Sequence, residues 1–217
     1  FIHTVIMTSA VYDYDYLVIG GGSGGIASAK RAVSHGKKVA LVERDRWGGT
    51  CVNVGCVPKK IMFLTATMAE IMKHDAIQYG FDPPDVKLNF GKLKEKRDAY
   101  ILKLNNIYKG GLDRSGVTTL SGDATFVDAH TVSITTTDGD ANNGTTTTQV
   151  TADKILIAVG GRPDLPTSTE GIDHCISRDG FFEMNELPQK VVVVGAGYIA
   201  VELAGVLNGW GSDTHVV

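Results

Sequence analysis

The stretch Tyr14-Asp15-Tyr16-Leu17-Val18-Ile19-Gly20-Gly21-Gly22-Ser23-Gly24-Gly25 decides the fold of this 217-residue chain. A short β-prone run ends in a cluster of glycines, and an alanine-containing segment with helical character follows over residues 26–34. Residues 39–42 then form a second apolar run, which ends at Glu43. A strand, a glycine turn, a helix and a second strand, in this order, predict the opening of a doubly wound α/β sheet.

The glycines of this stretch have the spacing of a dinucleotide-binding turn, with Gly20, Gly22 and Gly25 in the order G-x-G-x-x-G. Glycines allow the tight turn and bring the backbone close to a pyrophosphate at the helix N-terminus, where unpaired N–H groups and the helix dipole favour anions. Glu43, about 20 residues further on, is placed to accept hydrogen bonds from ribose hydroxyls. That acidic residue favours FAD or NAD over NADP. A glycine-rich turn without a ligand is the competing interpretation.

A second motif of the same kind lies near the end of the sequence. The apolar run 191–194 precedes Gly195-Ala196-Gly197-Tyr198-Ile199-Ala200, and we expect a helix to about residue 210 and a strand over 214–217. Two nucleotide-binding openings in one chain imply two dinucleotide cofactors. The residue that separates NAD from NADP is expected beyond Val217, so these residues leave the nicotinamide type open.

The residues between the two motifs show three kinds of pattern. A helix is predicted to start near Pro58 and to run past Ile71, and a second helix over 92–108 is predicted to bury one apolar face and to end at Gly110-Gly111. The apolar positions on that face are Leu93, Tyr100, Ile101, Leu104, Ile107 and Tyr108. Short strands are predicted over 117–120, 124–127 and 131–135, a solvated hairpin tip or flexible loop over 135–148, and a buried strand over 155–159.

Cys51 and Cys56 are close enough in sequence for their sulfurs to meet in a distorted helix. Near a helix N-terminus the dipole stabilises a thiolate, which makes the cysteine a better nucleophile and leaving group. Two buried cysteines or half of a zinc site are the alternatives. Zinc needs four ligands, and the chain adds only Cys175 and scattered histidines, so no metal is expected and Cys175 is interpreted as a partly buried cysteine.

The composition of the chain argues against some classes of binding partner and some cell compartments. The net charge is −3 and there is no sustained basic stripe, which argues against nucleic acid or an anionic membrane as the main partner. The apolar runs are too short to span a bilayer. Residues 1–6 lack a basic region and a long apolar core, so a secretory signal is not expected. Few cysteines fit a cytosolic location, with the mitochondrial matrix as the other possibility.

The cysteine segment Gly48-Gly49-Thr50-Cys51-Val52-Asn53-Val54-Gly55-Cys56-Val57-Pro58-Lys59-Lys60 resembles the redox-disulfide motif of the pyridine nucleotide–disulfide oxidoreductases. Both glycine motifs and the run 155–161 occur in that family's order, and the resemblance covers nearly all of residues 14–217. Within the family, Pro58-Lys59-Lys60 resembles the glutathione, trypanothione and large thioredoxin reductases. The segments 97–100, 104–108, 179–182 and 197–205 most resemble the glutathione-reductase branch.

The resemblance implies an electron path from NADPH to FAD, to a Cys51–Cys56 disulfide and then to oxidised glutathione. Cys51 would be the interchange thiol and Cys56 would lie against the flavin. Lys59 would approach the flavin and pair with Glu202; a solvated lysine and an exposed helical glutamate are the alternatives. A thioredoxin- or trypanothione-type reductase, or a non-catalytic truncated FAD-binding isoform, remain competing interpretations of the whole chain.

The resemblance also assigns binding residues. Positions that match FAD contacts are Gly20, Gly22, Ser23, Gly24, Gly25, Glu43, Gly49, Thr50, Cys51, Lys59, Ala124 and Gly160. Positions that match NADPH contacts are Gly195, Ala196, Gly197, Tyr198, Ile199 and Glu202. Positions that match glutathione contacts are Ser23, Lys30 and Tyr108. Core packing is the alternative for Tyr108 and for Tyr198, which would otherwise cover the nicotinamide pocket. The family usually has arginine in place of Lys30 and threonine in place of Val159.

We therefore expect an α/β chain with a doubly wound, Rossmann-like FAD-binding domain that contains an inserted β-meander, followed by the start of a second Rossmann-like domain for NADPH. The predicted divisions are an N-terminal extension (1–13), the FAD domain (14–186) and the beginning of the NADPH domain (187–217). The resemblance implies a homodimeric parent whose further domains supply a His–Glu acid/base pair. On that expectation, the chain alone has little or no turnover and leaves apolar surface uncovered at its last strands.

Overall fold

The computed structural model describes residues 11–82, 85, 87–137 and 144–217. They fall into two compact units. Among the described residues, unit 1 combines 11–49 with 107–137 and 144–160, and unit 2 combines 50–82, 85 and 87–106 with 161–217. These units are defined by which residues pack together, whereas the domains predicted from the sequence were defined by the cofactor that each would bind. The predicted domain divisions therefore stay a prediction. Most of the predicted N-terminal extension lies outside the described residues.

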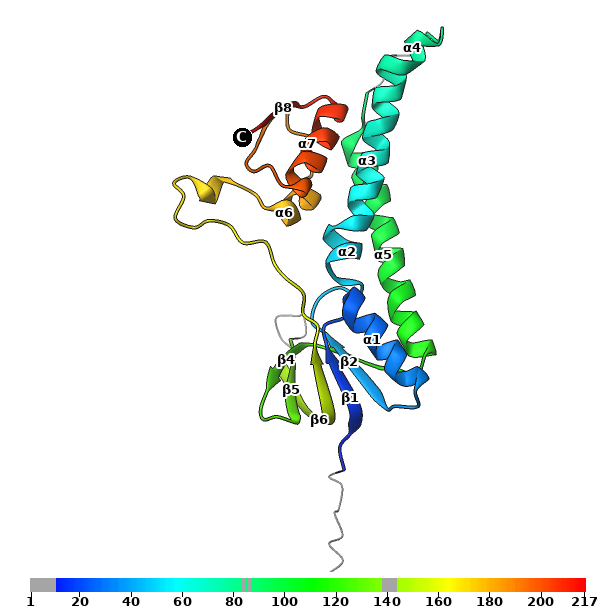
Figure 1. The fold of residues 1–217 in the computed structure, drawn as a ribbon, viewed down its shortest axis with the longest axis vertical. Coiled ribbons are helices and arrows are strands. Elements are labelled where there is room, and N and C mark those ends of the chain that lie inside the picture. Colours follow the sequence, from blue (N-terminus) through cyan, green and yellow to red (C-terminus); the bar gives the residue numbers. More distant parts are fainter. Residues whose placement is uncertain (1–10, 83–84, 86, 138–143) are drawn as a thin grey trace, which may run out of the picture. The chain divides into compact units, whose positions relative to one another are not determined.

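Unit 1 is built on a sheet whose parallel part has the order β3-β2-β1-β6 (Figure 1). The strands are β1 (Tyr14–Ile19), β2 (Val39–Glu43), β3 (Thr118–Ser121) and β6 (Thr145–Ile157). Helix α1 (Ser23–Ser34) connects β1 to β2. This is the predicted strand, glycine turn, helix and strand, and the α/β class is confirmed.

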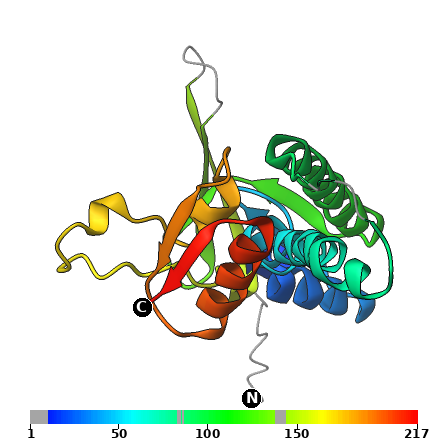
Figure 2. The ribbon, with the colours of Figure 1, turned by 90° about the horizontal axis from the view of Figure 1, so that it is seen from above.

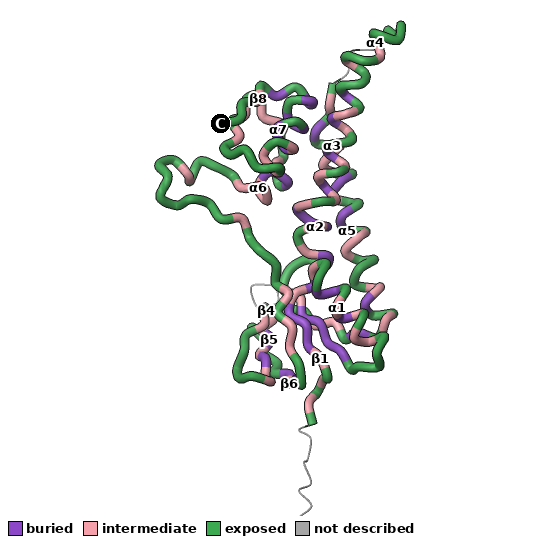
Figure 3. The backbone as a smooth tube through the Cα atoms, in the orientation of Figure 1, coloured by how far each residue is buried: buried purple, intermediate pink, exposed green. Residues whose placement is uncertain are grey.

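Both faces of the central strands are buried, as expected for a parallel sheet. Alternate residues of a strand point to opposite faces. Leu17 packs in one apolar cluster with Val132 and Ile134 of the inserted strands, whereas its neighbour Val18 packs in another cluster with Ile26 of α1. The second half of β1 and nearly all of β2 are accordingly buried, and Figure 3 shows the buried part of the tube at β1.

The predicted β-meander contains β4 (Asp123–Phe126) and β5 (Thr131–Thr137), which pair antiparallel with each other, and β5 also pairs antiparallel with β6. The structure corrects the prediction of a separate buried strand over 155–159. β6 is one long strand that serves the meander with its first half and the parallel sheet with its second half, and it ends at Ile157. Ile157 and Val159 are exposed.

The threonine-rich stretch is a hairpin, as predicted, but its flanks are strand rather than loop. Thr135 pairs with Thr147, and the ladder continues to Thr137 and Thr145. Threonine is β-branched and favours extended backbone, which explains why the ladder runs into this polar stretch. Residues 138–143, where the predicted tip falls, lie outside the described residues.

Unit 2 contains the second strand–turn–helix–strand segment. In Figure 2, β7 (Lys190–Val193) and β8 (Asp213–Val216) lie side by side as a parallel pair, next to the connecting helix α7 (Tyr198–Trp210). The strand, turn, helix and strand predicted for this segment are therefore confirmed. Val192 and Val194 are exposed, in agreement with the expected uncovered apolar surface.

The other elements of unit 2 are mostly helical. They are α2 (Gly49–Val54), α3 (Cys56–Glu70), the π-helical turn η1 (Ile71–Asp75), α4 (Ala76–Gln78), the 3-10 turn η2 (Ile172–His174) and α6 (Arg178–Glu183). Helix α3 thus starts at Cys56, slightly before the predicted Pro58. Its buried face meets α6 and α7 in one apolar cluster, which includes Met62, Phe182 and Trp210. No helix within the described residues is long and apolar enough to cross a membrane.

Helix α5 (Phe90–Arg114) contributes its residues to both units, and it corrects two predictions. It does not end at Gly110-Gly111, because Leu112 beyond them is fully buried. Burying a leucine stabilises by about 1.5–3 kcal/mol, which offsets a cost of about 1 kcal/mol for each helical glycine. The helix ends instead before Gly116, whose φ of +84° suits the left-handed residue that follows a helix.

The predicted apolar face of α5 is also only partly right. Ile101 is buried and Leu93 is half-buried, but Tyr100, Ile107 and Tyr108 are exposed. The buried stripe runs through Phe90, Ile101 and Leu112 and contains a charged residue, Arg97, between them. Periodicity alone therefore misplaced the aromatic positions of this helix.

Two neighbouring glycines of α1 give a stability test. A Cβ on Gly25 would lie 1.9 Å from the Gly20 carbonyl oxygen, whereas a Cβ on Gly24 would meet nothing within 4 Å. We expect Gly25→Ala to lower the free energy of unfolding by about 1–3 kcal/mol or more, because helix and turn must separate. Gly24→Ala should leave it unchanged or raise it by up to about 1 kcal/mol. Urea unfolding followed by circular dichroism measures both; equal values for the two variants would contradict the close packing.

Candidate functional site

The glycine turn of unit 1 is shaped by close backbone approaches. Gly20 has a φ of +111°, and its N–H donates to the Val42 carbonyl at 2.8 Å. A Cβ on Gly20 would lie 2.4 Å from the Ala158 carbonyl oxygen. Position 20 therefore needs glycine for its backbone angle and for the neighbouring strand end.

The N-terminus of α1 has the properties of an anion site. Gly22 is the N-cap, no side chain caps the helix, and no acidic residue lies in its first turn. The first N–H groups of a helix lack intrahelical partners, and the helix dipole adds positive potential there. The turn and the helix start therefore fit the pyrophosphate of a dinucleotide such as FAD.

Glu43 holds the glycine turn by hydrogen bonds. Its Oε2 accepts from the Gly21 N–H at 2.6 Å, and its Oε1 accepts from the Asp45 N–H at 2.8 Å. Each carboxylate oxygen has a second lone pair, so these bonds leave capacity for ribose hydroxyls. The predicted ribose contact of Glu43 is compatible with this geometry and stays a prediction.

The beginning of the cysteine segment packs onto the same turn. The Gly48 N–H donates to the Gly21 carbonyl at 2.8 Å, and a Cβ on Gly49 would lie 2.7 Å from the Gly22 Cα. Both Gly48 and Gly49 have positive φ angles. Helix α2 starts at Gly49, so Thr50 and Cys51 follow directly from the contact with the glycine turn.

Two further predicted FAD contacts lie elsewhere in unit 1. Ala124 is half-buried on β4 and packs against the apolar cluster of the sheet. Gly160 is exposed after the end of β6 and has a φ of +69°. Their contacts with FAD stay predictions.

The chain reverses sharply between the two cysteines of unit 2. A Cβ on Gly55 would lie 2.8 Å from the Thr50 carbonyl oxygen and 3.2 Å from the Cys51 Cα, so only glycine allows this approach. The reversal brings the thiols of Cys51 and Cys56 within hydrogen-bonding reach of each other. Both cysteines are free, with Cys51 half-buried and Cys56 exposed. The spacing prediction that the two sulfurs can meet is confirmed.

The protonation of Cys51 differs from the expectation based on the helix dipole. Burial raises the pKa of the Cys51 thiol above its ordinary value, and the adjacent Cys56 side chain raises it further. Desolvation disfavours the thiolate, and α2 has only six residues to oppose it. The surroundings of Cys51 therefore favour its neutral thiol over the thiolate.

Lys59 and Glu202 form an ion pair within unit 2. Lys59 Nζ lies 2.6 Å from Glu202 Oε2, which joins α3 to α7. The hydrogen bond to Glu202 raises the pKa of Lys59, so its ammonium is maintained one turn of helix after Cys56. The structure thus brings together the two residues that the resemblance paired, and their roles in catalysis stay predictions.

The second glycine turn is more open than the first. Gly195 has a φ of +117°, and Gly197 is the N-cap of α7 without a side-chain cap. A Cβ on either glycine would meet nothing within 4 Å. Tyr198 is 75% exposed, so it is not a packing aromatic, whereas Ile199 is half-buried against the core of unit 2. The turn fits a nucleotide phosphate for the same reasons as the first.

The predicted glutathione contacts of unit 1 lie near one another. Ser23 and Lys30 are seven residues apart on α1, which places them on one face of the helix. Lys30 Nζ would lie 3.1 Å from a Cβ on Gly111, three residues after Tyr108 on α5. Tyr108 is 37% exposed, which disfavours the alternative of core packing.

A family comparison agrees with this geometry. The family model described as pyridine nucleotide-disulphide oxidoreductase matches residues 14–217. The chain belongs to this family. It is also 51% identical over 205 residues to a protein named glutathione reductase from Schizosaccharomyces pombe (strain 972 / ATCC 24843). That match covers 94% of this chain and 43% of the yeast protein, so the chain spans less than half the length of this relative.

Arg97 connects three helices of unit 2, and the sequence analysis assigned it no role. It is only 3% exposed, and its guanidinium donates to the Phe182 carbonyl at 2.6 Å and to Met62 Sδ at 3.4 Å. It also pairs with Asp98 Oδ1 at 2.7 Å. Arg97 therefore ties α5 to α3 and to the end of α6. A charged residue seven positions after Phe90, on an otherwise apolar stripe, was the available signal.

Asn53 and Asn105 form a second link that the sequence did not reveal. Asn105 Nδ2 donates to Asn53 Oδ1 at 3.0 Å, which joins α5 to α2. Asn53 is buried although it lies between the two cysteines. The only signal in the sequence was a polar residue between two valines.

Two smaller expectations concern Cys175 and metals. Cys175 is exposed rather than partly buried, because it follows a single 3-10 turn in a loop. Within the described ranges, no three His, Cys, Asp or Glu side chains gather in a way that could hold a metal ion.

The Arg97–Asp98 pair predicts a pH-dependent contribution to stability. Burial opposes ionisation of Asp98, but hydrogen bonds from Lys94 and Arg97 outweigh it and hold the pKa of Asp98 below its ordinary 3.8. A lowered folded-state pKa gives stability that is present above the ordinary pKa and is lost as pH falls through the folded value. Asp98→Asn should therefore cost about 1 kcal/mol near neutral pH, because the carboxylate is partly solvated, and almost nothing near pH 2.

Urea unfolding at several pH values measures this difference. Asp82→Asn, in an exposed loop, is the matched control and should have little effect at any pH. An Asp98→Asn cost that does not shrink in acid would show that the ionised pair is not its source.

Proposed function

We propose that the protein carrying this chain is a flavoprotein disulfide reductase that uses NADPH to reduce oxidised glutathione. The observation that carries the proposal is the adjacency of the Cys51 and Cys56 thiols, directly after a segment that packs on a dinucleotide-type glycine turn. Oxidised glutathione is favoured as the substrate because the chain is 51% identical to a protein named glutathione reductase.

In this proposal, residues of unit 1 bind FAD. The uncapped start of α1 would bind the pyrophosphate and Glu43 would bind the ribose, with the turn kept rigid by its close glycine contacts. FAD, when bound, would accept a hydride from NADPH and supply two electrons to the cysteine pair. The second glycine turn, with the exposed Tyr198 beside it, is the proposed NADPH site.

The proposed substrate half-reaction is two thiol–disulfide exchanges. A base removes the proton of Cys51, and its thiolate attacks one sulfur of oxidised glutathione, which releases one glutathione thiolate and leaves a mixed disulfide. The thiolate of Cys56 then attacks Cys51 Sγ and releases the second glutathione. Two protein thiols and one glutathione disulfide thus become one protein disulfide and two glutathione thiols.

The charges of the described residues support these two exchange steps. Lys59 remains an ammonium beside the cysteine turn because Glu202 binds it, so positive charge is available where a thiolate forms. Lys30 would bind a carboxylate of glutathione as a point charge, without the bidentate geometry of arginine. Ser23 and Tyr108 would add hydroxyl groups from the same region of unit 1.

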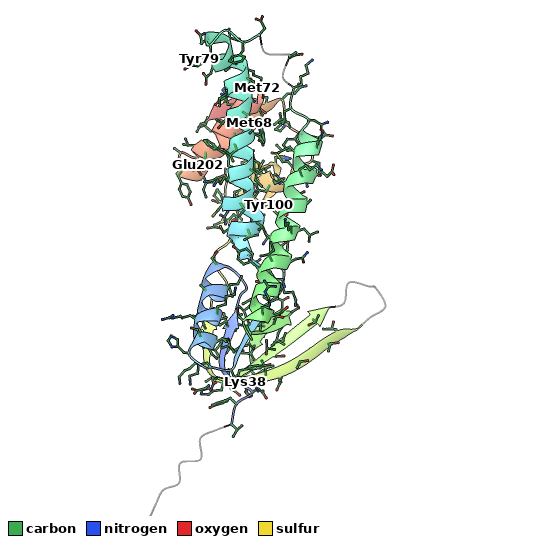
Figure 4. All side chains as sticks on the ribbon, turned by 90° about the vertical axis from the view of Figure 1, so that its right-hand side faces the viewer. Lys38, Met68, Met72, Tyr79, Tyr100 and Glu202 are labelled. Carbon is green, nitrogen blue, oxygen red and sulfur yellow. The ribbon has the colours of Figure 1, made fainter. Side chains whose placement is uncertain are left out.

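Location and assembly are further parts of the proposal. The chain has only three cysteines, which supports a cytosolic or mitochondrial-matrix location. A homodimer is proposed for the full-length protein, and it is supported by exposed apolar side chains on α3 and η1, among them Phe63, Met68 and Met72. Figure 4 labels Met68 and Met72. Sedimentation of the holoenzyme tests the dimer.

Reconstitution with FAD tests the function. We expect the chain to bind FAD and, after gentle two-electron reduction, to show the long-wavelength absorbance of a thiolate in contact with a flavin. Cys56→Ser should abolish this absorbance, because it removes the sulfur proposed to lie against the ring. Cys175→Ser changes the same residue type at an exposed loop and should retain it. Absence of the band in the unaltered holoprotein, or its survival in Cys56→Ser, would contradict the proposal.

A further inference from the structure

The cysteine turn is held by a short helix that cannot be stable alone. Helix α2 has six residues and ends where the chain reverses at Gly55. A helix of this length needs tertiary contacts to form, because nucleation is unfavourable. Its last three residues, Val52, Asn53 and Val54, are all buried, and Val54 belongs to the apolar cluster of unit 2.

Asn53 is the polar member of this buried trio. It is 5% exposed, and its Oδ1 accepts from Asn105 Nδ2 at 3.0 Å. Apolar contacts are not directional, so the two valines alone would leave α2 free to rotate or slide. A hydrogen bond between buried amides is directional and favours one orientation, because another position of α2 would break it.

Asn105 is a firm point of attachment. It lies on the 25-residue helix α5, eight residues after Arg97. The buried Arg97 guanidinium joins α5 to Met62 of α3 and to the Phe182 carbonyl. Helix α5 therefore holds α3, which begins with Cys56, through Arg97, and holds α2, which carries Cys51, through Asn105.

We propose that Asn53 and Asn105 are a positioning pair for the redox cysteines: their hydrogen bond fixes α2 so that the Cys51 sulfur stays beside the Cys56 sulfur. This inference rests on the proposed disulfide chemistry and extends it to residues that touch neither cofactor nor substrate. A disulfide tolerates only narrow ranges of sulfur and Cβ separation. Holding the two thiols in that range raises their effective concentration and favours the disulfide over the dithiol.

The redox equilibrium of the cysteine pair is the direct test. The full chain is equilibrated in mixtures of reduced and oxidised glutathione, in which one protein disulfide forms for every two glutathione thiols released. Free thiols are then trapped by alkylation and counted. Asn105→Ala and Asn53→Ala should each lower the disulfide-to-dithiol ratio about tenfold, which is roughly 30 mV for a two-electron couple. The double variant should lower it by less than the sum of the two single effects, since either substitution removes the hydrogen bond that the two residues share.

Asn106→Ala is the matched control, because Asn106 is the exposed neighbour of Asn105 on the same helix. It should have the ratio of the unaltered chain. The far-UV circular dichroism spectrum should be the same in every variant, which shows that the chain remains folded. If Asn53→Ala does not fold, Asn105→Ala and the milder Asn105→Ser, at a half-buried position, give the decision.

Three results would overturn the inference. The ratios of the Asn105 variants could equal that of Asn106→Ala, or the effects of the Asn53 and Asn105 substitutions could add. The substitutions could also lower only the free energy of unfolding, as a purely structural pair would. If the unaltered chain forms no Cys51–Cys56 disulfide at any mixture, the proposed function fails together with the inference, and this outcome is distinguishable from the other three.

Discussion

The reversal of the chain at Gly55 is the constraint on which the redox site depends. Any side chain there would collide with the Thr50 carbonyl oxygen, 2.8 Å from the position of a Cβ. Because the backbone can fold back, Cys51 meets Cys56, and α3 begins at Cys56 itself. The cysteine pair is thus a property of backbone geometry, and its surroundings serve to keep that geometry.

Helix α3 joins the cysteine turn to the nucleotide-type helix α7 at both ends of their interface. Near its start, Lys59 pairs with Glu202, and further along, Trp210 Nε1 donates to Thr65 Oγ1 at 3.3 Å. A Cβ on Gly209 would lie 3.1 Å from the Ala66 Cβ, so the two helices approach closely there. An ion pair at one end and close packing at the other fix the register of the two helices.

Local patterns could be predicted from the sequence, and non-local contacts could not. The first strand–turn–helix–strand unit and the meeting of the two cysteines follow from spacing within about 30 residues, where glycine and apolar periodicity carry the signal. The continuation of α5 past Gly110 depends on a burial site for Leu112 in unit 1. The extension of the strand predicted over 155–159 back to Thr145 in β6 depends on pairing with both β1 and β5. The hydrogen bonds of Arg97, Asn53 and Asn105 could not be predicted, because their partners are distant in sequence. Burial likewise reversed the expected direction of the Cys51 pKa.

Disulfide mapping tests the central claim, that Cys51 and Cys56 are redox partners in this fold, most directly. The chain is oxidised with a small excess of oxidised glutathione at neutral pH, free thiols are alkylated, and the digested peptides are identified by mass spectrometry. The account predicts one bridge, between Cys51 and Cys56, with Cys175 recovered in alkylated form. Bridges that involve Cys175, or separate glutathione adducts on Cys51 and Cys56 that never convert to a bridge, would contradict it.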